Sequence, residues 1–219
     1  MKHAPPRAIL FDWDNTLVDG WAAIEAGLNA AFRAFDMPLW DRAQVLANVR
    51  RALRESFPEL FGAEWERARD IFYAEVRACH LQVLTPMPGA AAALEAGAGR
   101  LPMGVVSNKQ GPLLRAEAVH LGWDRHFGPL IGAGDAAADK PDPAPILMAL
   151  QSLGLSPALD IWYVGDTALD MQAARAAGVR AVLMGDAAHD GGIAAAGADQ
   201  VFDDCHALAV AVSSLVKPA

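Results

Sequence analysis

Short apolar runs recur along the second half of the chain, separated by alanine-rich stretches of helical character. Runs rich in Val, Ile and Leu, bounded by Gly, Pro or Asp, are typical of strands buried on both faces. Because helical stretches join these runs, the pattern predicts an α/β fold, a doubly wound, Rossmann-like parallel sheet with helices on both faces. The predicted strands are 8–11, 103–107, 130–134, 161–165, 180–185 and a weaker 200–202.

Residues 17–84 have a different pattern, with apolar positions three or four residues apart. Ile24, Leu28 and Phe32 follow this spacing, and so do Phe72 and Val76. The spacing predicts three or four packed helices and no strand, with interruptions at 57–58 and 85–90. We therefore predict two domains. Residues 1–16 and 86–219 form the Rossmann-like core, and residues 17–85 form a small helical cap inserted after the first strand.

Composition and charge exclude several classes of partner. The chain has 219 residues, of which 53% are apolar and 20% charged, and no apolar stretch approaches the roughly 18 residues of a membrane span. We expect a soluble protein without a membrane partner. The first residues lack the apolar core of a signal peptide, so a cytoplasmic location is expected. A net charge of −8 disfavours binding to a nucleic acid polymer.

The two cysteines carry no recognisable chemistry. Cys79 and Cys205 are far apart and lack the spacing of metal ligands. Neither a disulfide framework nor a zinc site is therefore indicated. The sequence also carries no signal of an oligomeric state.

Polar residues follow the predicted strands at the point where each one ends. In a doubly wound sheet, ligands bind outside the carboxyl ends of the strands, so we expect these residues to share one site. They are Asp12 and Asp14 after the first strand, Ser107 and Asn108 after the second, Lys140 in a loop after the third, and Asp166 and Asp170 after the fourth.

Two of these carboxylates create an electrostatic problem. An extended chain would point Asp12 and Asp14 to the same side, and two carboxylates about 4 Å apart repel by roughly 4 kcal/mol at an effective dielectric constant of about 20. Asp166 and Asp170 would add to this repulsion. A hard divalent cation reverses the sign of the interaction, and Mg²⁺ prefers a site made of oxygen ligands. We therefore predict Mg²⁺ as the cofactor.

Four motifs in this order resemble the haloacid dehalogenase superfamily of aspartate-nucleophile phosphatases. They are 12-DWDNT-16, 107-SN-108, 139-DKPDP-143 and 165-GDTALD-170. The resemblance extends over nearly the whole chain, to the phosphoglycolate-phosphatase-like branch with a helical cap after the first motif. It also chooses among three Gly-Asp motifs with similar spacing, because the family places its acidic motif after the lysine. Asp135 and Asp186, in the other two, are expected to be helix caps or loop acids.

The resemblance implies a role for each motif residue. Asp12 would be the nucleophile that forms an aspartyl-phosphate, and Asp14 would be the general acid and then the general base. Ser107, Asn108 and Lys140 would bind the phosphoryl group. The Mg²⁺ ligands would be Asp12, the backbone carbonyl of Asp14, Asp166 and Asp170, the last either directly or through water.

The implied activity is Mg²⁺-dependent hydrolysis of a small phosphorylated metabolite. The candidates are a phosphoglycolate-like phosphomonoester, a sugar phosphate and a nucleotide. Asp14 argues against the dehalogenase and phosphonate-cleaving branches, whereas a phosphomutase and a non-catalytic phosphate-binding regulator remain alternatives. The helical cap would be a lid that selects the substrate.

Four further residues allow two interpretations each. Arg50, Arg51 and Arg54 form either a solvated helix face or a site for a second anionic group of the substrate. Trp13 either lines the pocket or packs in the core.

Overall fold

The computed structural model describes residues 5–49 and 53–215, and it divides into two compact units. The sheet unit comprises the chain up to Val18 and from Pro86 onward, and the helical unit is Asp19–Thr85. Two short strands, β2 (Val18–Asp19) and β3 (Thr85–Pro86), pair where the chain passes between the units. Each is only two residues long, which explains why the hydrophobic pattern gave no sign of them.

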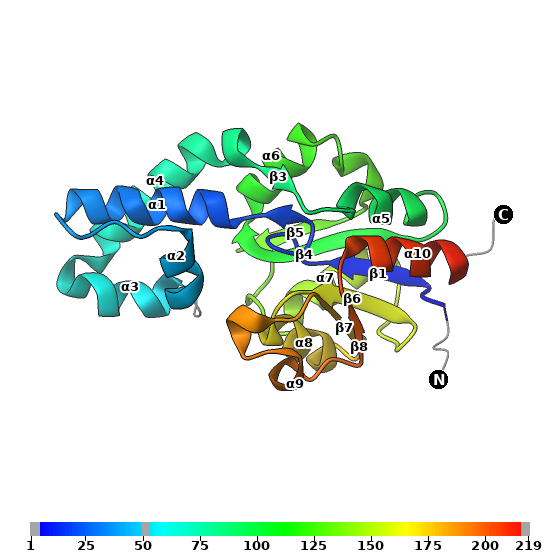
Figure 1. Cartoon of the computed structure of the whole chain (residues 1–219). Helices are drawn as coiled ribbons and strands as arrows, with labels where there is room; N and C mark the ends of the chain where they lie inside the picture. Colours follow the sequence, from blue (N-terminus) through cyan, green and yellow to red (C-terminus); the bar gives the residue numbers. More distant parts are fainter. Residues whose placement is uncertain (1–4, 50–52, 216–219) are drawn as a thin grey trace. The chain divides into compact units, whose positions relative to one another are not determined.

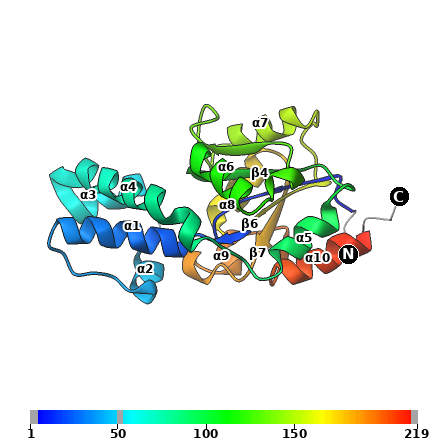
Figure 2. The same cartoon turned by 90° about the horizontal axis from the view of Figure 1, so that it is seen from above.

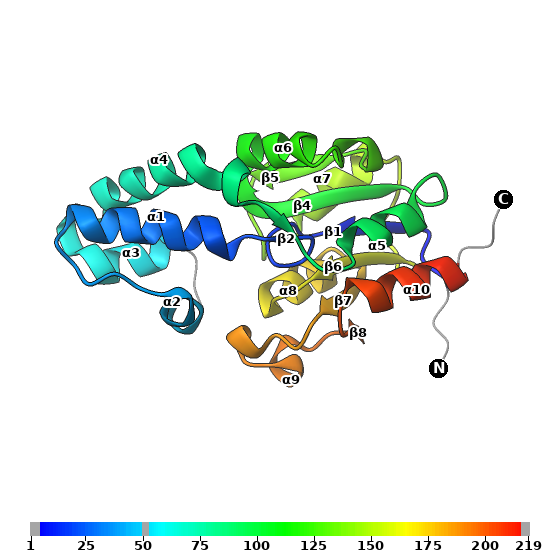
Figure 3. The ribbon, with the colours of Figure 1, turned by 45° about the horizontal axis from the view of Figure 1, so that its top comes forward.

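Six parallel strands form the sheet unit, in the order β5-β4-β1-β6-β7-β8 (Figure 3). This arrangement confirms the predicted doubly wound α/β fold, and the strands lie where the apolar runs placed them. Only the second run differs appreciably, because its strand continues through the polar residues to Gln110. The strands are β1 (Ala8–Phe11), β4 (Met103–Gln110), β5 (Leu130–Ala133), β6 (Ile161–Gly165), β7 (Arg180–Met184) and β8 (Gln200–Phe202).

Helices cover both faces of this sheet. Side chains of α7 and α8 pack in one buried cluster with Leu10, Tyr163 and Leu183 of the strands. Helices α5 and α10 lie side by side on the other side of the sheet from α7 (Figure 2). The helices are α5 (Ala90–Gly97), α6 (Gly111–His120), α7 (Ala144–Ser152), α8 (Ala168–Ala176), α9 (Ile193–Ala196) and α10 (Cys205–Leu215), with short 3-10 turns η2 (Asp124–His126) and η3 (Ala188–Asp190).

The helical unit contains the predicted packed helices. Helices α1 and α4, the longest of the unit, pack against each other (Figure 1). Aromatic rings fill its core, with Phe32 and Phe61 5.7 Å apart. Its elements are α1 (Trp21–Ala34), α2 (Arg42–Asn48), α3 (Leu53–Phe61), the 3-10 turn η1 (Gly62–Glu64) and α4 (Trp65–Val83).

The predicted interruption at Phe57-Pro58 is wrong, because α3 runs through both residues. Phe57 is buried, and its ring lies 5.2 Å from that of Phe61 and 5.6 Å from that of Phe72. Burial of this side chain offsets the helix hydrogen bond that Pro58 cannot donate. Arg50, Arg51 and the side chain of Arg54 lie outside the described residues.

In the described part of the chain, none of the helices combines the length and the apolar character that crossing a bilayer requires.

Candidate active site

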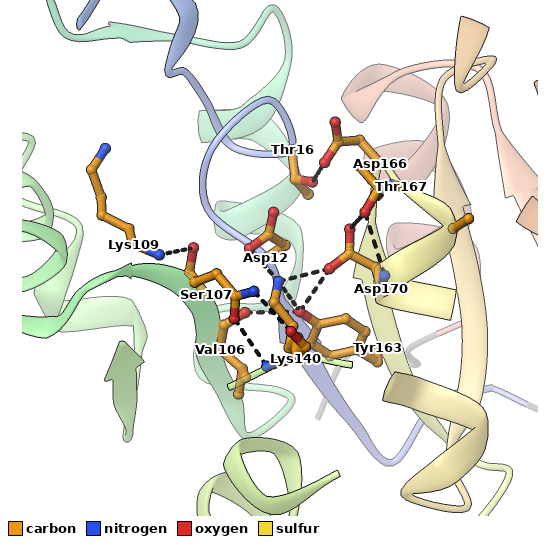
Figure 4. A network of polar contacts seen from close by, with 12 residues as sticks. Asp12, Thr16, Val106, Ser107, Lys109, Lys140, Tyr163, Asp166, Thr167 and Asp170 are labelled. Carbon is orange, nitrogen blue, oxygen red and sulfur yellow. Dashed lines mark hydrogen bonds and ion pairs between the residues drawn. The ribbon is translucent and has the colours of Figure 1, made fainter. Parts of the chain in front are cut away.

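Four of the predicted site residues meet at the carboxyl edge of the sheet (Figure 4). Asp12 follows β1, Asp166 follows β6, Asp170 lies in the first turn of α8, and Lys140 comes from the loop between β5 and α7. All four are buried. The parallel topology therefore collects three carboxylates and one ammonium group from distant parts of the sequence.

Lys140 is the centre of this group. Its Nζ donates to Asp12 Oδ1 and to Asp170 Oδ1, each at 2.7 Å, and to the Tyr163 hydroxyl at 2.9 Å. Burial alone would lower the pKa of Lys140, but the two carboxylates raise it well above its usual range. The side chain is therefore a permanent cation with all three donors in use.

The N-terminus of α8 holds the Asp170 carboxylate in position. Thr167 is the N-cap residue, and its backbone N–H and hydroxyl donate to Asp170 Oδ2 at 3.1 and 2.6 Å. Asp170 Oδ1 accepts from Lys140 and, at 3.2 Å, from Tyr163. Burial opposes ionisation of Asp170, but Lys140 and the bonds from Thr167 outweigh it and lower the pKa below its usual value. Gly165 makes room for this arrangement, because a Cβ there would overlap the Asp170 carboxyl group.

The other two carboxylates are less well compensated. Burial raises the pKa of Asp12 to about 7; Lys140 opposes the rise, and Asp170 and Asp166 add to it. Burial also raises the pKa of Asp166, against a lowering effect of His189, whose Nε2 lies 3.4 Å from Asp166 Oδ2. The Thr16 hydroxyl donates to Asp166 Oδ1 at 3.3 Å. Ionising both groups in this buried place requires additional positive charge.

The three carboxylates have the geometry to bind a metal ion, and the ion would supply this positive charge. One oxygen each of Asp12, Asp166 and Asp170 lie within 4.8 Å of one another. A set of carboxylate oxygens matches the ligand preference of Mg²⁺. The residues present therefore fit the ion that the sequence predicted.

Ser107 and Asn108 lie within the second half of β4, not after the strand as the sequence predicted. The Ser107 hydroxyl accepts from the backbone N–H of Lys109 at 3.3 Å. The Asn108 side chain bonds twice to the backbone of Lys140, donating to its carbonyl and accepting from its N–H, each at 3.0 Å. The Asn108 amide thus holds the loop of Lys140 in place. Both of its polar atoms are engaged there.

The Asp14 side chain has a separate set of partners. Lys109 Nζ lies 2.7 Å from Asp14 Oδ1 and 2.8 Å from Glu117 Oε2. Trp13 Nε1 donates to the same Glu117 oxygen at 2.7 Å. Trp13 itself is fully buried, with its ring 6.0 Å from that of Trp123, which decides for core packing.

Sequence reasoning missed several residues that support the site. Tyr163 stands in an apolar run that predicts a strand, and a buried tyrosine hydroxyl usually needs a partner. Thr167 stands inside the quoted motif, where a Thr three residues before an acid is the signature of a capping box. Glu117 gave no signal, because an acid on an alanine-rich helix is usually solvated.

The remaining Gly-Asp motifs have structural contacts, as expected. Asp135 Oδ2 accepts from the backbone N–H of Gly132 at 2.8 Å and from Arg115 at 2.7 Å. Asp186 Oδ1 accepts from the N–H of Ala188 at 2.9 Å.

Comparisons with known proteins identify the family. A family model described as haloacid dehalogenase-like hydrolase matches residues 9–184. The chain belongs to this family. Phosphoglycolate phosphatase from Xylella fastidiosa strain 9a5c is 34% identical over 215 residues, covering 94% of this chain and 93% of its own. Phosphoglycolate phosphatase from Pectobacterium atrosepticum is 33% identical over 189 residues, covering 81% of this chain and 80% of its own.

Solved structures agree on the fold of this hydrolase. A haloacid dehalogenase-like family hydrolase from Streptococcus pneumoniae superposes with a TM-score of 0.80 at 23% identity, covering 90% of this chain and 93% of its own. The predicted family, its phosphoglycolate-phosphatase-like branch and the enzyme class, a phosphatase, are confirmed.

Proposed function

We propose that this hydrolase is a Mg²⁺-dependent phosphatase that cleaves a small phosphomonoester, phosphoglycolate in the first place, through an aspartyl-phosphate intermediate. The observation that carries the proposal is the buried group of Asp12, Asp166, Asp170 and Lys140 at the carboxyl edge of the sheet. The relatives named phosphoglycolate phosphatase, 34% identical in the case of Xylella fastidiosa, support this substrate.

Asp12 and Asp166 would hold Mg²⁺ through carboxylate oxygens, together with the Asp14 backbone carbonyl. Both oxygens of Asp170 already accept hydrogen bonds from the protein, which supports contact of Asp170 with the ion through water. When bound, the ion neutralises charge on the carboxylates and on the phosphoryl oxygens.

The proposed reaction has two steps. The Asp12 carboxylate attacks phosphorus, and the bond from phosphorus to the ester oxygen breaks. Asp14 donates a proton to the departing oxygen and later takes one from the water that attacks the phosphorylated Asp12. The second attack breaks the bond between phosphorus and Asp12 and releases inorganic phosphate. The carboxylates are regenerated.

Positive charge and N–H groups hold the phosphoryl oxygens. Lys140 lies beside Asp12 and offsets the charge that gathers there during transfer. The Ser107 hydroxyl, which accepts from the N–H of Lys109, keeps its own proton for a phosphoryl oxygen. Asn108 contributes its backbone N–H, while its side chain fixes the Lys140 loop. Phosphoryl transfer depends mainly on such positioning and charge stabilisation.

The helical unit, residues 19–85, is the second part of the proposal. We assign substrate selection to it, since the sheet residues named above account for the phosphoryl group alone. Replacing this unit by that of a relative would change the preferred ester and leave hydrolysis of p-nitrophenyl phosphate in place.

A screen of phosphorylated metabolites tests the function. Purified protein is incubated with each ester, with Mg²⁺ or with a chelator, and phosphate release is measured together with the organic product. We expect Mg²⁺-dependent release that the Asp12→Asn variant loses. Full activity of that variant would refute the assignment of Asp12 as the nucleophile. An isomerised sugar phosphate would indicate a mutase, and binding without turnover would indicate a regulator.

A further inference from the structure

We infer that Lys109 and Glu117 are a positioning pair that orients the Asp14 carboxylate for proton transfer to the leaving group. This inference rests on the proposed function, and it adds two residues to which the four motifs assign no role. The observation behind it is a chain of buried polar contacts that links Asp14 to the core.

The chain of contacts is closed on itself. Lys109 Nζ bridges Asp14 Oδ1 and Glu117 Oε2 at 2.7 and 2.8 Å, and Trp13 Nε1 holds that Glu117 oxygen at 2.7 Å. Trp13 directly precedes Asp14 in the sequence, so the ring returns to its starting point through one peptide bond. The Trp13 ring is fixed in turn by Trp123 and by Phe127, whose centroid is 6.4 Å away.

Burial distinguishes this pair from a surface ion pair. The side chain of Lys109 is 9% exposed and that of Glu117 is 0% exposed. Burial would lower the pKa of Lys109, but Asp14 and Glu117 raise it, so the ammonium group stays charged. A buried ion pair seldom gives the most stable protein, since replacing it by apolar residues of similar volume often leaves the stability unchanged or raises it. A role in orienting Asp14 explains why charges stand here.

The geometry specifies which oxygen of Asp14 does the work. An ammonium group has three donors and no acceptor, so Oδ1, which faces Lys109, accepts a hydrogen bond and does not carry the transferable proton. The proton therefore moves to and from Oδ2. The Asp14 side chain is 26% exposed and stands on a loop, where a single rotamer is not imposed by packing. Lys109 supplies that constraint, and Glu117 keeps Lys109 in place.

Figure 4 separates this role from that of Lys140. The Lys109 side chain leads away from the cluster of Asp12, Lys140 and Asp170, while the Lys140 ammonium faces the carboxylates. The two lysines thus serve different carboxylates. Lys140 pairs with Asp12, the proposed nucleophile, and Lys109 pairs with Asp14, the proposed general acid.

The test uses two aryl esters that differ in their need for an acid. Phenol is a weaker acid than p-nitrophenol, so phenyl phosphate depends more on protonation of its leaving oxygen. A general acid contributes about 100- to 10,000-fold. We expect Lys109→Met to lower kcat/KM for phenyl phosphate at least about tenfold more than for p-nitrophenyl phosphate. Asp14→Asn should give the same pattern, and Asp14→Asn combined with Lys109→Met should be no worse than Asp14→Asn alone.

Two further variants control for folding. Lys109→Met leaves Glu117 buried without its cation, so the double variant Lys109→Met/Glu117→Gln removes both charges and should show the same dependence on the leaving group. Arg115→Met removes a cation from the same helix as Glu117, one paired with Asp135, and should leave both rates unchanged.

The outcomes separate the two proposals. A wild-type protein that hydrolyses neither ester with Mg²⁺ would overturn the proposed function, and the inference with it. Suppose that wild type is active and that Asp14→Asn lowers kcat/KM more for phenyl phosphate than for p-nitrophenyl phosphate. An equal loss of kcat/KM on both esters in Lys109→Met/Glu117→Gln would then overturn the inference alone. The inference would also be overturned if Lys109→Met lowered kcat/KM by the same factor in the Asp14→Asn background as in wild type, because the two residues would then act independently.

Discussion

Replacing Asp12, the proposed nucleophile, by Asn should stabilise the metal-free protein relative to wild type as pH rises from 5 to 8. Asp12 is buried beside Asp166 and Asp170, and its pKa is raised from 3.8 to about 7. A carboxyl group with a higher pKa in the folded chain binds its proton more tightly when folded. Stability is therefore lost as pH rises through the interval between the two values. The Asp12→Asn variant has no such group, while its amide oxygen still accepts from Lys140.

The size of the effect follows from the pH interval. Each pH unit between the unfolded and folded pKa values changes the free energy of unfolding by about 1.4 kcal/mol. From pH 5 to the pKa of about 7, wild type therefore loses roughly 3 kcal/mol relative to Asp12→Asn. For a chain of this length, about 2–4 °C in Tm corresponds to 1 kcal/mol. The relative gain of the variant should thus be roughly 6–12 °C.

Thermal unfolding of both proteins measures this difference. Scans are run in chelator at pH 5 and pH 8, and again at pH 8 with Mg²⁺. We expect the variant to gain on wild type between pH 5 and pH 8 in chelator. Mg²⁺ should close the gap, because the proposed binding of the ion to folded wild type would stabilise it by mass action.

Asp135→Asn is the matched control. The hydrogen bond from Arg115 holds the pKa of Asp135 below its usual value, against the effect of burial. Stability from such a group is present above the unfolded pKa and is lost only as pH falls through the folded one. Its difference from wild type should be the same at pH 5 and pH 8. If Asp12→Asn behaved in the same flat way, the burial argument for Asp12 would be refuted.

Three further predictions concern the same cluster. Lys140→Met leaves two buried carboxylates without their cation and should lower the free energy of unfolding by about 3–5 kcal/mol in urea titrations; a loss below about 1 kcal/mol would contradict the central position of this lysine. Gly165→Ala should displace the Asp170 carboxyl group and lower phosphate release at least about tenfold in steady-state assays. Asp166→Asn should abolish stimulation by Mg²⁺, whereas Asp186→Asn should keep wild-type rates, and equal effects would overturn the choice among the Gly-Asp motifs.

Much of the fold could be predicted because a parallel sheet has a simple sequence pattern. Strands buried on both faces, such as β6, are almost continuously apolar. The rule that parallel strands present their carboxyl ends at one edge then brought Asp12, Lys140 and Asp166 together without any knowledge of side-chain geometry. Their chemical roles stay predictions until the variants are measured.

Pairings of side chains could not be predicted in the same way. The contact of Lys109 with Glu117 depends on how a helix packs on a strand and on the rotamers of both residues, and neither is written in residue spacing. Pro58 gives the opposite case, since local preference favoured a break and burial of Phe57 prevailed. Local rules fail where tertiary packing contributes the larger free energy.

The helical unit enters the chain at one point and contributes no strand to the described six-stranded sheet. The chain leaves after Val18 and returns at Pro86, so helices can be lengthened, shortened or grafted there without altering strand order or register. If these helices choose the ester, selectivity can diverge among descendants of one ancestor while the reaction chemistry is inherited unchanged.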